Sequence, residues 1–292
     1  MTRGRMDGRL GRRKWTEAFF LVLMIGSTVI VVLSLLLIVG TIVWKGLPAL
    51  NLSMVTQTPK GGYYLGKEGG ILNAILGSLY LALGATALAL IFSLPVALYL
   101  NLYVGRSSRL ATFARFALDV LWGIPSIVYG AFGFLVMMLV GLRASLLAGI
   151  ITVALLELPI MTRTMDEVVR LVPRELREAS FSLGATRLET AFKVVTRQCL
   201  PGFLTAVLIA FGRGIGDAAS VLFTAGFTDR VPLGLLQPVA TLPLAIFFQL
   251  GTPFPEVQQR AYASAAVLTI LILVLSVLAR VLVKRATRHV IK

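Results

Sequence analysis

Histidine and cysteine are almost missing from this sequence, which has one residue of each among 292. The single histidine, His289, belongs to a basic C-terminal stretch, and Cys199 has no second thiol with which to form a disulfide or a thiolate metal site. Metal catalysis and histidine-based acid–base chemistry therefore lack the side chains that they require. We expect no catalytic residues, no metal site and no cofactor in this chain.

Acidic residues are also few: 13 Asp and Glu stand against 28 Lys and Arg, and the formal net charge is +15. An excess of this size can indicate a nucleic-acid partner, but the basic residues form neither a single patch nor a nucleic-acid-binding motif. They lie between long apolar runs, where a membrane protein places them. The Gly-x-x-x-x-Gly-Lys-Ser/Thr loop of nucleotide-binding proteins is missing as well. The sequence therefore predicts no nucleic-acid partner and no nucleotide site of its own.

Apolar residues are abundant, at 57% of the chain, and the mean hydropathy is +0.88. A soluble domain of ordinary composition is about 45–50% apolar. The excess is arranged in runs long enough to cross a bilayer as helices. We predict an all-α membrane protein with six transmembrane helices, at 18–43, 71–100, 116–142, 145–162, 202–225 and 262–283. Gly123 and Pro125 predict a break inside the third helix, and the apolar stretch 242–248 is too short to span, which favours an interfacial or re-entrant piece.

The distribution of Lys and Arg sets the orientation of these helices. Most of the Lys and Arg residues lie near the two ends of the chain, in the 101–115 loop and in the long polar segment 163–198. Basic segments stay on the cytoplasmic side of a membrane, so both the N- and the C-terminus are predicted to be cytoplasmic. The chain then divides into four parts. They are a cytoplasmic basic tail (1–17), the first transmembrane helix with an external loop (18–70), a core that contains the cytoplasmic loop 163–198 (71–283), and a second cytoplasmic tail (284–292).

The fifth predicted helix carries charges at membrane depth. Arg213 and Asp217 are four residues apart and would share one face of a helix. Gly212 and Gly216 form a Gly-x-x-x-Gly pair, which lets another helix approach closely. One interpretation places Arg213 on an anion pathway, because an arginine fork suits a tetrahedral oxyanion. The other is a structural ion pair that fixes helix packing.

Two more charges stand within the fourth predicted helix and at its end. Arg163 lies just beyond it and is either a second anion contact or an ordinary anchor at the cytoplasmic end of a helix. Glu157 is either a gate or partner for an arginine, or a group that relieves the helix break at Pro159. The residues alone leave both questions open.

The polar segment 163–198 predicts short helices. Thr164-x-x-Glu167 and Thr186-x-x-Glu189 both fit the capping box, Gly184 is the expected stop before the last of these helices, and Pro201 suits the first turn of the fifth transmembrane helix. An apolar stripe on the middle helix could sit in the groove of a partner or pack on this protein's own helix ends. The stripe consists of Leu176, Ala179 and Leu183.

At this point the sequence resembles a known family. Glu178-Ala179-Ser180, followed after three residues by Gly184, is similar to the EAA loop of ABC importer permeases. The fuller string VPRELREASFSLGATR at 172–187 is closer to phosphate-import permeases of the PstA type. Further similar stretches are GILNAILG at 70–77, GIPSIVYG at 123–130, LPIMTRTMDE at 158–167 and LFTA at 222–225. The combination covers most of the chain from Gly70 onward.

The resemblance implies a MetI-like ABC importer permease in the inner membrane of a bacterium or archaeon. It also implies a second permease of the PstC type, two ATPase subunits that bind ATP-Mg, and an extracytoplasmic phosphate-binding protein, all working among membrane lipids. The implied substrate-pathway residues are Arg213, Asp217 and Arg163. The implied contacts to the ATPase are Leu176, Glu178, Ala179, Ser180, Leu183 and Gly184. The family has Glu where this chain has Asp217, and Leu-Pro where it has Thr196-Arg197.

The expected function is therefore that of the transmembrane permease subunit of an ATP-driven phosphate importer, working by alternating access, and not that of an enzyme. An importer of another oxyanion, such as sulfate or molybdate, is the alternative. A membrane enzyme acting on lipid phosphates would require clustered acid–base or metal-binding groups, and the sequence offers only isolated charges.

Overall fold

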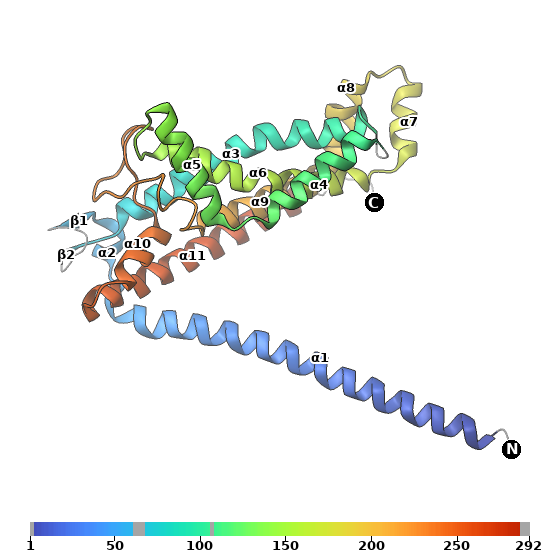
Figure 1. The fold of residues 1–292 in the computed structure, drawn as a ribbon, viewed down its shortest axis with the longest axis horizontal. Helices are drawn as coiled ribbons and strands as arrows, with labels where there is room; N and C mark the ends of the chain where they lie inside the picture. Colours follow the sequence, from blue (N-terminus) through green and yellow to red (C-terminus); the bar gives the residue numbers. More distant parts are fainter. Residues whose placement is uncertain (1–2, 61–67, 106–107, 287–292) are drawn as a thin grey trace.

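The computed structural model describes residues 3–60, 68–105 and 108–286 (Figure 1). His289 and the end of the predicted tail 284–292 lie outside the described residues. Most of the structure is helical, as predicted. In chain order the elements are α1 Arg3–Gly46, η1 Leu47–Ala49, α2 Leu52–Thr56, β1 Pro59–Lys60, β2 Glu68–Gly69, α3 Leu72–Leu102, α4 Arg109–Gly123, α5 Ser126–Val140, α6 Leu146–Arg170, α7 Arg174–Ser182, α8 Arg187–Glu189, η2 Thr190–Val195, α9 Thr196–Ile215, α10 Leu242–Leu250 and α11 Pro255–Ala286. The strands β1 and β2 pair as a two-residue antiparallel ribbon.

Five helical stretches of the described chain are long and apolar enough to cross a membrane, and α4 with α5 makes six if that pair is one broken span. This confirms the predicted class. The break at Gly123 and Pro125 is also confirmed, but it is a bend of 100° rather than a kink, because Ile124 and Pro125 both adopt extended backbone. Proline removes a helical hydrogen bond and disfavours a helical residue before it. Helix α10, with nine residues, is not among the candidate spans.

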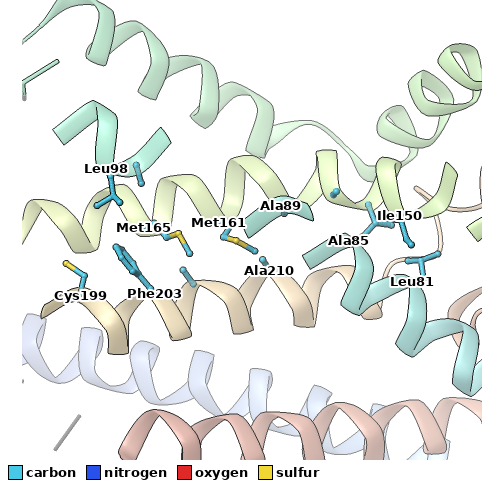
Figure 2. Packing of buried hydrophobic residues seen from close by; sticks show 14 of the residues in the cluster. Leu81, Ala85, Ala89, Leu98, Ile150, Met161, Met165, Cys199, Phe203 and Ala210 are labelled. Atoms are coloured by element: carbon cyan, nitrogen blue, oxygen red, sulfur yellow. The ribbon is translucent and has the colours of Figure 1, made fainter. Parts of the chain in front are cut away.

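The main core lies where α3, α6 and α9 meet (Figure 2). Small side chains such as Ala85, Ala89 and Ala210 let the helix backbones approach closely, while larger ones, including Met161 and Phe203, fill the space between them. Helix α6 lies between the other two and is the most buried of the candidate spans. A second, smaller core joins α10 and α11 to the start of α3.

Helix α1 diverges from the other helices along most of its length (Figure 1). It approaches α11 at its C-terminal end, where Gly46 lies so close to the backbone of Tyr262 that an added Cβ would be 2.8 Å from that carbonyl oxygen. The apolar side chains of its middle are exposed in the single chain. The helix is longer at both ends than the predicted span 18–43.

The predicted bounds of the fifth transmembrane helix, 202–225, are wrong at both ends. The helix begins at Arg187 and runs without interruption through α8, η2 and α9 to Ile215. Pro201 lies inside it, so packing along α3 and α6 outweighs the local cost of one missing hydrogen bond. The helix ends early because Gly216 and the small polar residues that follow are poor helix formers, and the chain continues in turns.

One of the two predicted capping boxes is wrong and the other is confirmed. Helix α6 continues past 162 to Arg170, and the hydroxyl of Thr164 donates to the carbonyl oxygen of Ile160 within that helix. Thr186 caps the next helix as expected: its hydroxyl accepts from the N–H of Glu189, whose carboxylate accepts from the N–H of Thr186. Gly184 is the predicted stop, with φ +82°.

Candidate functional site

Arg213 lies on the face of α9 that points away from the core. Its side chain is exposed, and no hydrogen bond or ion pair joins it to the part of the chain that the structure describes. Gly212 beside it has no atom within 4 Å of the position that a Cβ would occupy, and at Gly216 the nearest atom is a carbonyl oxygen of the same helix at 3.6 Å. This glycine–arginine face of α9 is thus open to a second chain or to a polar pathway.

Asp217 does not share that face, and the predicted Arg213–Asp217 ion pair on one helix is therefore wrong. Helix α9 ends at Ile215, and the Asp217 carboxylate accepts a hydrogen bond of 2.8 Å from the N–H of Ser220. An aspartate that satisfies a backbone N–H three residues ahead stabilises a turn rather than a helix. Asp217 therefore shapes the chain that leaves α9.

Glu157 is buried where α6 meets α9. The absent side chain of Gly214 makes room for it, because a Cβ there would collide with a Glu157 carboxylate oxygen and lie 2.9 Å from a methyl group of Val153. Neither Glu157 oxygen has a hydrogen-bond partner among the described residues. It pairs with no described arginine, and it accepts no backbone N–H near Pro159. The predicted pairing with an arginine is therefore not found among the described residues, and the relief of the break at Pro159 is not found either, while a role as a gate stays a prediction.

Arg163 lies six residues after Glu157 on α6, which is about 9 Å along the helix axis. Its guanidinium group contacts three carboxylates. The Nε atom donates to Asp119 of α4 at 2.7 Å, one Nη donates to Asp166 at 3.2 Å, and the other lies 3.6 Å from Glu167. In this state Arg163 is part of an ion cluster, and it is brought together neither with Arg213 nor with Asp217.

Asp166 is the centre of this cluster and is fully buried. Arg115 of α4 donates to both of its oxygens, at 2.9 and 3.0 Å, and Asn101 at the end of α3 donates at 2.7 Å. A buried carboxylate is tolerated when it is paired and hydrogen-bonded in this way. The contacts tie α3, α4 and α6 together at one level of the bundle. Arg115 is inside a helix and not in the 101–115 loop that the sequence suggested.

The predicted contacts to an ATPase lie on α7 and the turn after it, at one end of the molecule (Figure 1). For the apolar stripe of this helix, packing on the protein itself and contact with a partner each fit a different part. Leu176 packs against this protein's own core, and Ser180 is buried, with its hydroxyl 2.9 Å from that of Thr190. These two residues fasten α7 to the start of the long helix.

The remaining members of that set are free to meet a partner. Glu178, Ala179 and Gly184 are exposed, and the side chain of Leu183 has a relative exposure of 88%. An exposed leucine at the end of a short helix fits a helix-in-groove contact.

Sequence reasoning missed Asp119, Asp166 and Arg115. A signal was present for Asp166, because it stands three residues after Arg163 and can share its helix face. No comparable signal existed for Asp119, which is 44 residues from Arg163 in the sequence.

The spans, the buried ion cluster and the exposed end of α7 define a multi-pass membrane protein with a short helix, α7, at one end. The sequence profile of the family described as "Binding-protein-dependent transport system inner membrane component" matches residues 93–292. The chain belongs to this family, whose members are permease subunits of ABC importers.

Similar proteins support that assignment. The phosphate transport system permease protein PstA of Yersinia pestis is 34% identical over 280 residues, covering 95% of this chain and 94% of that protein. A probable phosphate transport system permease PstA of Methanocaldococcus jannaschii is 31% identical over 269 residues, covering 89% and 91%. Among solved structures, a chain of the inward-facing MetNI methionine ABC transporter superposes with a TM-score of 0.60 at 20% identity, covering 75% and 96%. That likeness shows the fold.

Proposed function

We propose that this chain is the transmembrane permease subunit of an ATP-driven phosphate importer and forms half of the translocation pathway. The observation that carries the pathway is the open glycine–arginine face of α9. A charged side chain at membrane depth is costly unless it faces a partner or a water-filled cavity. The similarity to proteins named as phosphate transport permeases supplies the substrate class.

A second permease of the PstC type covers the open face and completes a heterodimer. Two ATPase subunits that hold ATP-Mg bind the exposed side of α7, and an extracytoplasmic phosphate-binding protein delivers the anion. This chain needs no cofactor of its own. The inner membrane of a bacterium or archaeon is the setting, with both termini cytoplasmic. The first turns of α1 and the last turns of α11 point toward the end of the long axis where α7 lies (Figure 1), which supports that orientation.

The mechanism is alternating access, and the long helix gives it a mechanical route. Closure of the ATPase dimer moves α7, which is bound to the start of the helix through Ser180 and Thr190. From Arg187 to Ile215 the helix is continuous over 29 residues, or about 42 Å at the usual rise. A displacement at α7 therefore reaches Arg213 at the other end. Phosphate passes Arg213 and then Arg163, while Asp217 fixes the turn beyond.

Uptake by the reconstituted complex tests this proposal. Proteoliposomes with this chain, its partner permease, the ATPase and the binding protein should accumulate phosphate when supplied with ATP. Arg213→Ala should abolish uptake, and Arg213→Lys should restore little of it, because a point charge does not replace a bidentate fork. The complex and its ATPase activity must stay intact in both variants. Full uptake by Arg213→Ala would remove α9 from the pathway.

An importer of sulfate or molybdate is the alternative, and the same vesicles distinguish it. Uptake of sulfate or molybdate in place of phosphate would keep the architecture and overturn the substrate.

A further inference from the structure

The three carboxylates around Arg163 are not equivalent. Asp166 is fully buried and is already held by Arg115 and Asn101, so its contact with Arg163 is one of several. Glu167 is 61% exposed, lies 3.6 Å away and makes no hydrogen bond to Arg163. Asp119 is half exposed, makes the shortest contact, at 2.7 Å, and has no other partner within the described chain.

Asp119 therefore occupies the accessible side of the arginine. Its Oδ1 atom accepts the Nε–H of the guanidinium group, and an oxygen of phosphate can accept the same charge-assisted hydrogen bond. Its departure into solvent would leave the buried Asp166–Arg115 pair undisturbed. The exchange of Asp119 for a free oxyanion is thus a local step that does not dismantle the cluster.

The charge balance also opposes a free anion at Arg163 in this state. Among the described residues, two guanidinium groups of the cluster, those of Arg115 and Arg163, face three carboxylates. An incoming oxyanion would meet a surplus of negative charge unless Asp119 withdraws. Asp119 stands on α4 four residues before Gly123, where the chain bends by 100° into α5. A change in that bend would carry Asp119 away from α6.

We propose that Asp119 is a resident competitor for the anion site at Arg163: it occupies the guanidinium group while α4 lies beside α6, and the transported oxyanion replaces it when α4 moves. Asp119 thereby sets the affinity of this inner site and acts on the substrate through Arg163. The inference rests on the proposed function, because it takes Arg163 as a substrate contact.

Equilibrium titration of the complete complex with inorganic phosphate, and in parallel with sulfate, tests the competitor without depending on transport. The variants are Asp119→Asn, which keeps the shape and removes the charge, and Asp119→Ala. Glu167→Gln is the matched control, because it removes a charge beside the same arginine but breaks no hydrogen bond. Each substitution is also made together with Arg163→Ala, and thermal unfolding checks that the variants fold.

Losing a competing half-exposed ion pair should lower the Kd for phosphate about three- to fivefold in both Asp119 variants. Glu167→Gln should change it less than about twofold, and the Asp119 effect should vanish with Arg163→Ala. The proposal is overturned if Asp119→Asn does not tighten binding, if the tightening persists without Arg163, or if no variant binds either anion. Tighter binding of sulfate alone would support the role of Asp119 as competitor and overturn phosphate as the substrate. The titration therefore separates the competitor proposal from the proposed function.

Discussion

Helices α9 and α6 approach closely at Gly214, and the substitution Gly214→Ala measures how tightly the two helices are held there. The new methyl group would meet the carboxylate of Glu157 and a methyl group of Val153. Glu157 is fully buried and has no solvent to move into, so the helices must separate or the side chains must leave their rotamers. Overpacking of this kind costs about 1–3 kcal/mol.

Gly212→Ala is the matched control. It lies on the same helix, two residues away, and nothing is within 4 Å of its added Cβ. Both substitutions gain the same helix propensity of about 1 kcal/mol over glycine, so the difference between them isolates the collision. For a chain of this size, about 1–3 kcal/mol corresponds to a few degrees in the unfolding midpoint.

Thermal unfolding of the purified chain in detergent is the assay. We expect Gly214→Ala to unfold on the order of 5 °C below Gly212→Ala. Glu157→Ala should remove most of the difference between the two glycine variants, because it removes the carboxylate from the contact. Equal midpoints for the two alanine variants, or a penalty that is unchanged in the Glu157→Ala background, would refute the reasoning.

The other predictions concern the ion cluster around Asp166 and the helix α7 with the turn after it. Asp166→Asn should lower the free energy of unfolding by about 3–5 kcal/mol in denaturant titrations, because it leaves buried arginine charge without its partner; a loss below about 1 kcal/mol would contradict this. Leu183→Asp should abolish co-purification of the ATPase subunits without changing the unfolding midpoint, whereas Leu171→Asp, which is similarly exposed at 82%, should leave assembly intact. Gly184→Ala should cost about 1–2 kcal/mol of stability through its positive φ alone, since no atom lies within 4 Å of its Cβ position; an unchanged midpoint would refute it.

The apolar runs were sufficient to predict the class and nearly all the spans, because a bilayer requires about 20 apolar residues per helix. The break at Gly123 and Pro125 was equally predictable, since it depends on local backbone chemistry. The size of the bend was not predictable, because the angle between α4 and α5 depends on what each half packs against.

The two capping boxes show where a local motif is insufficient. Thr164-x-x-Glu167 and Thr186-x-x-Glu189 are equivalent as patterns, yet only the second starts a helix. Around the first, Met161, Met165 and Val169 are all buried, so the apolar face of α6 continues through it at helical spacing. That periodicity was visible in the sequence and outweighs the cap. Before Thr186, Gly184 adopts a positive φ and interrupts the helix.

The candidate site was predictable as residue types but not as pairs. Arg213 and Arg163 stand out in the sequence as charges beside apolar runs. The partner assigned to Arg213 was wrong because it depended on where α9 ends, and helix ends near small polar residues are the least certain feature of a pattern. The partners of Arg163 come from another helix, and their distance along the chain hides them.

The arrangement of the two arginines implies that they respond to different moving parts. Arg213 belongs to the continuous helix that starts beside α7, so under the proposed function its position would follow the motion of the ATPase subunits. The accessible side of Arg163 is occupied from α4, whose direction is set at the bend before α5. Glu157 and Gly214 bring α6 and α9 into contact next to Arg213, and Arg163 lies six residues further along α6. Under the function and the competitor role proposed above, an oxyanion that leaves Arg213 would reach Arg163 only after α4 has withdrawn Asp119, and one chain would then expose its two anion contacts in sequence.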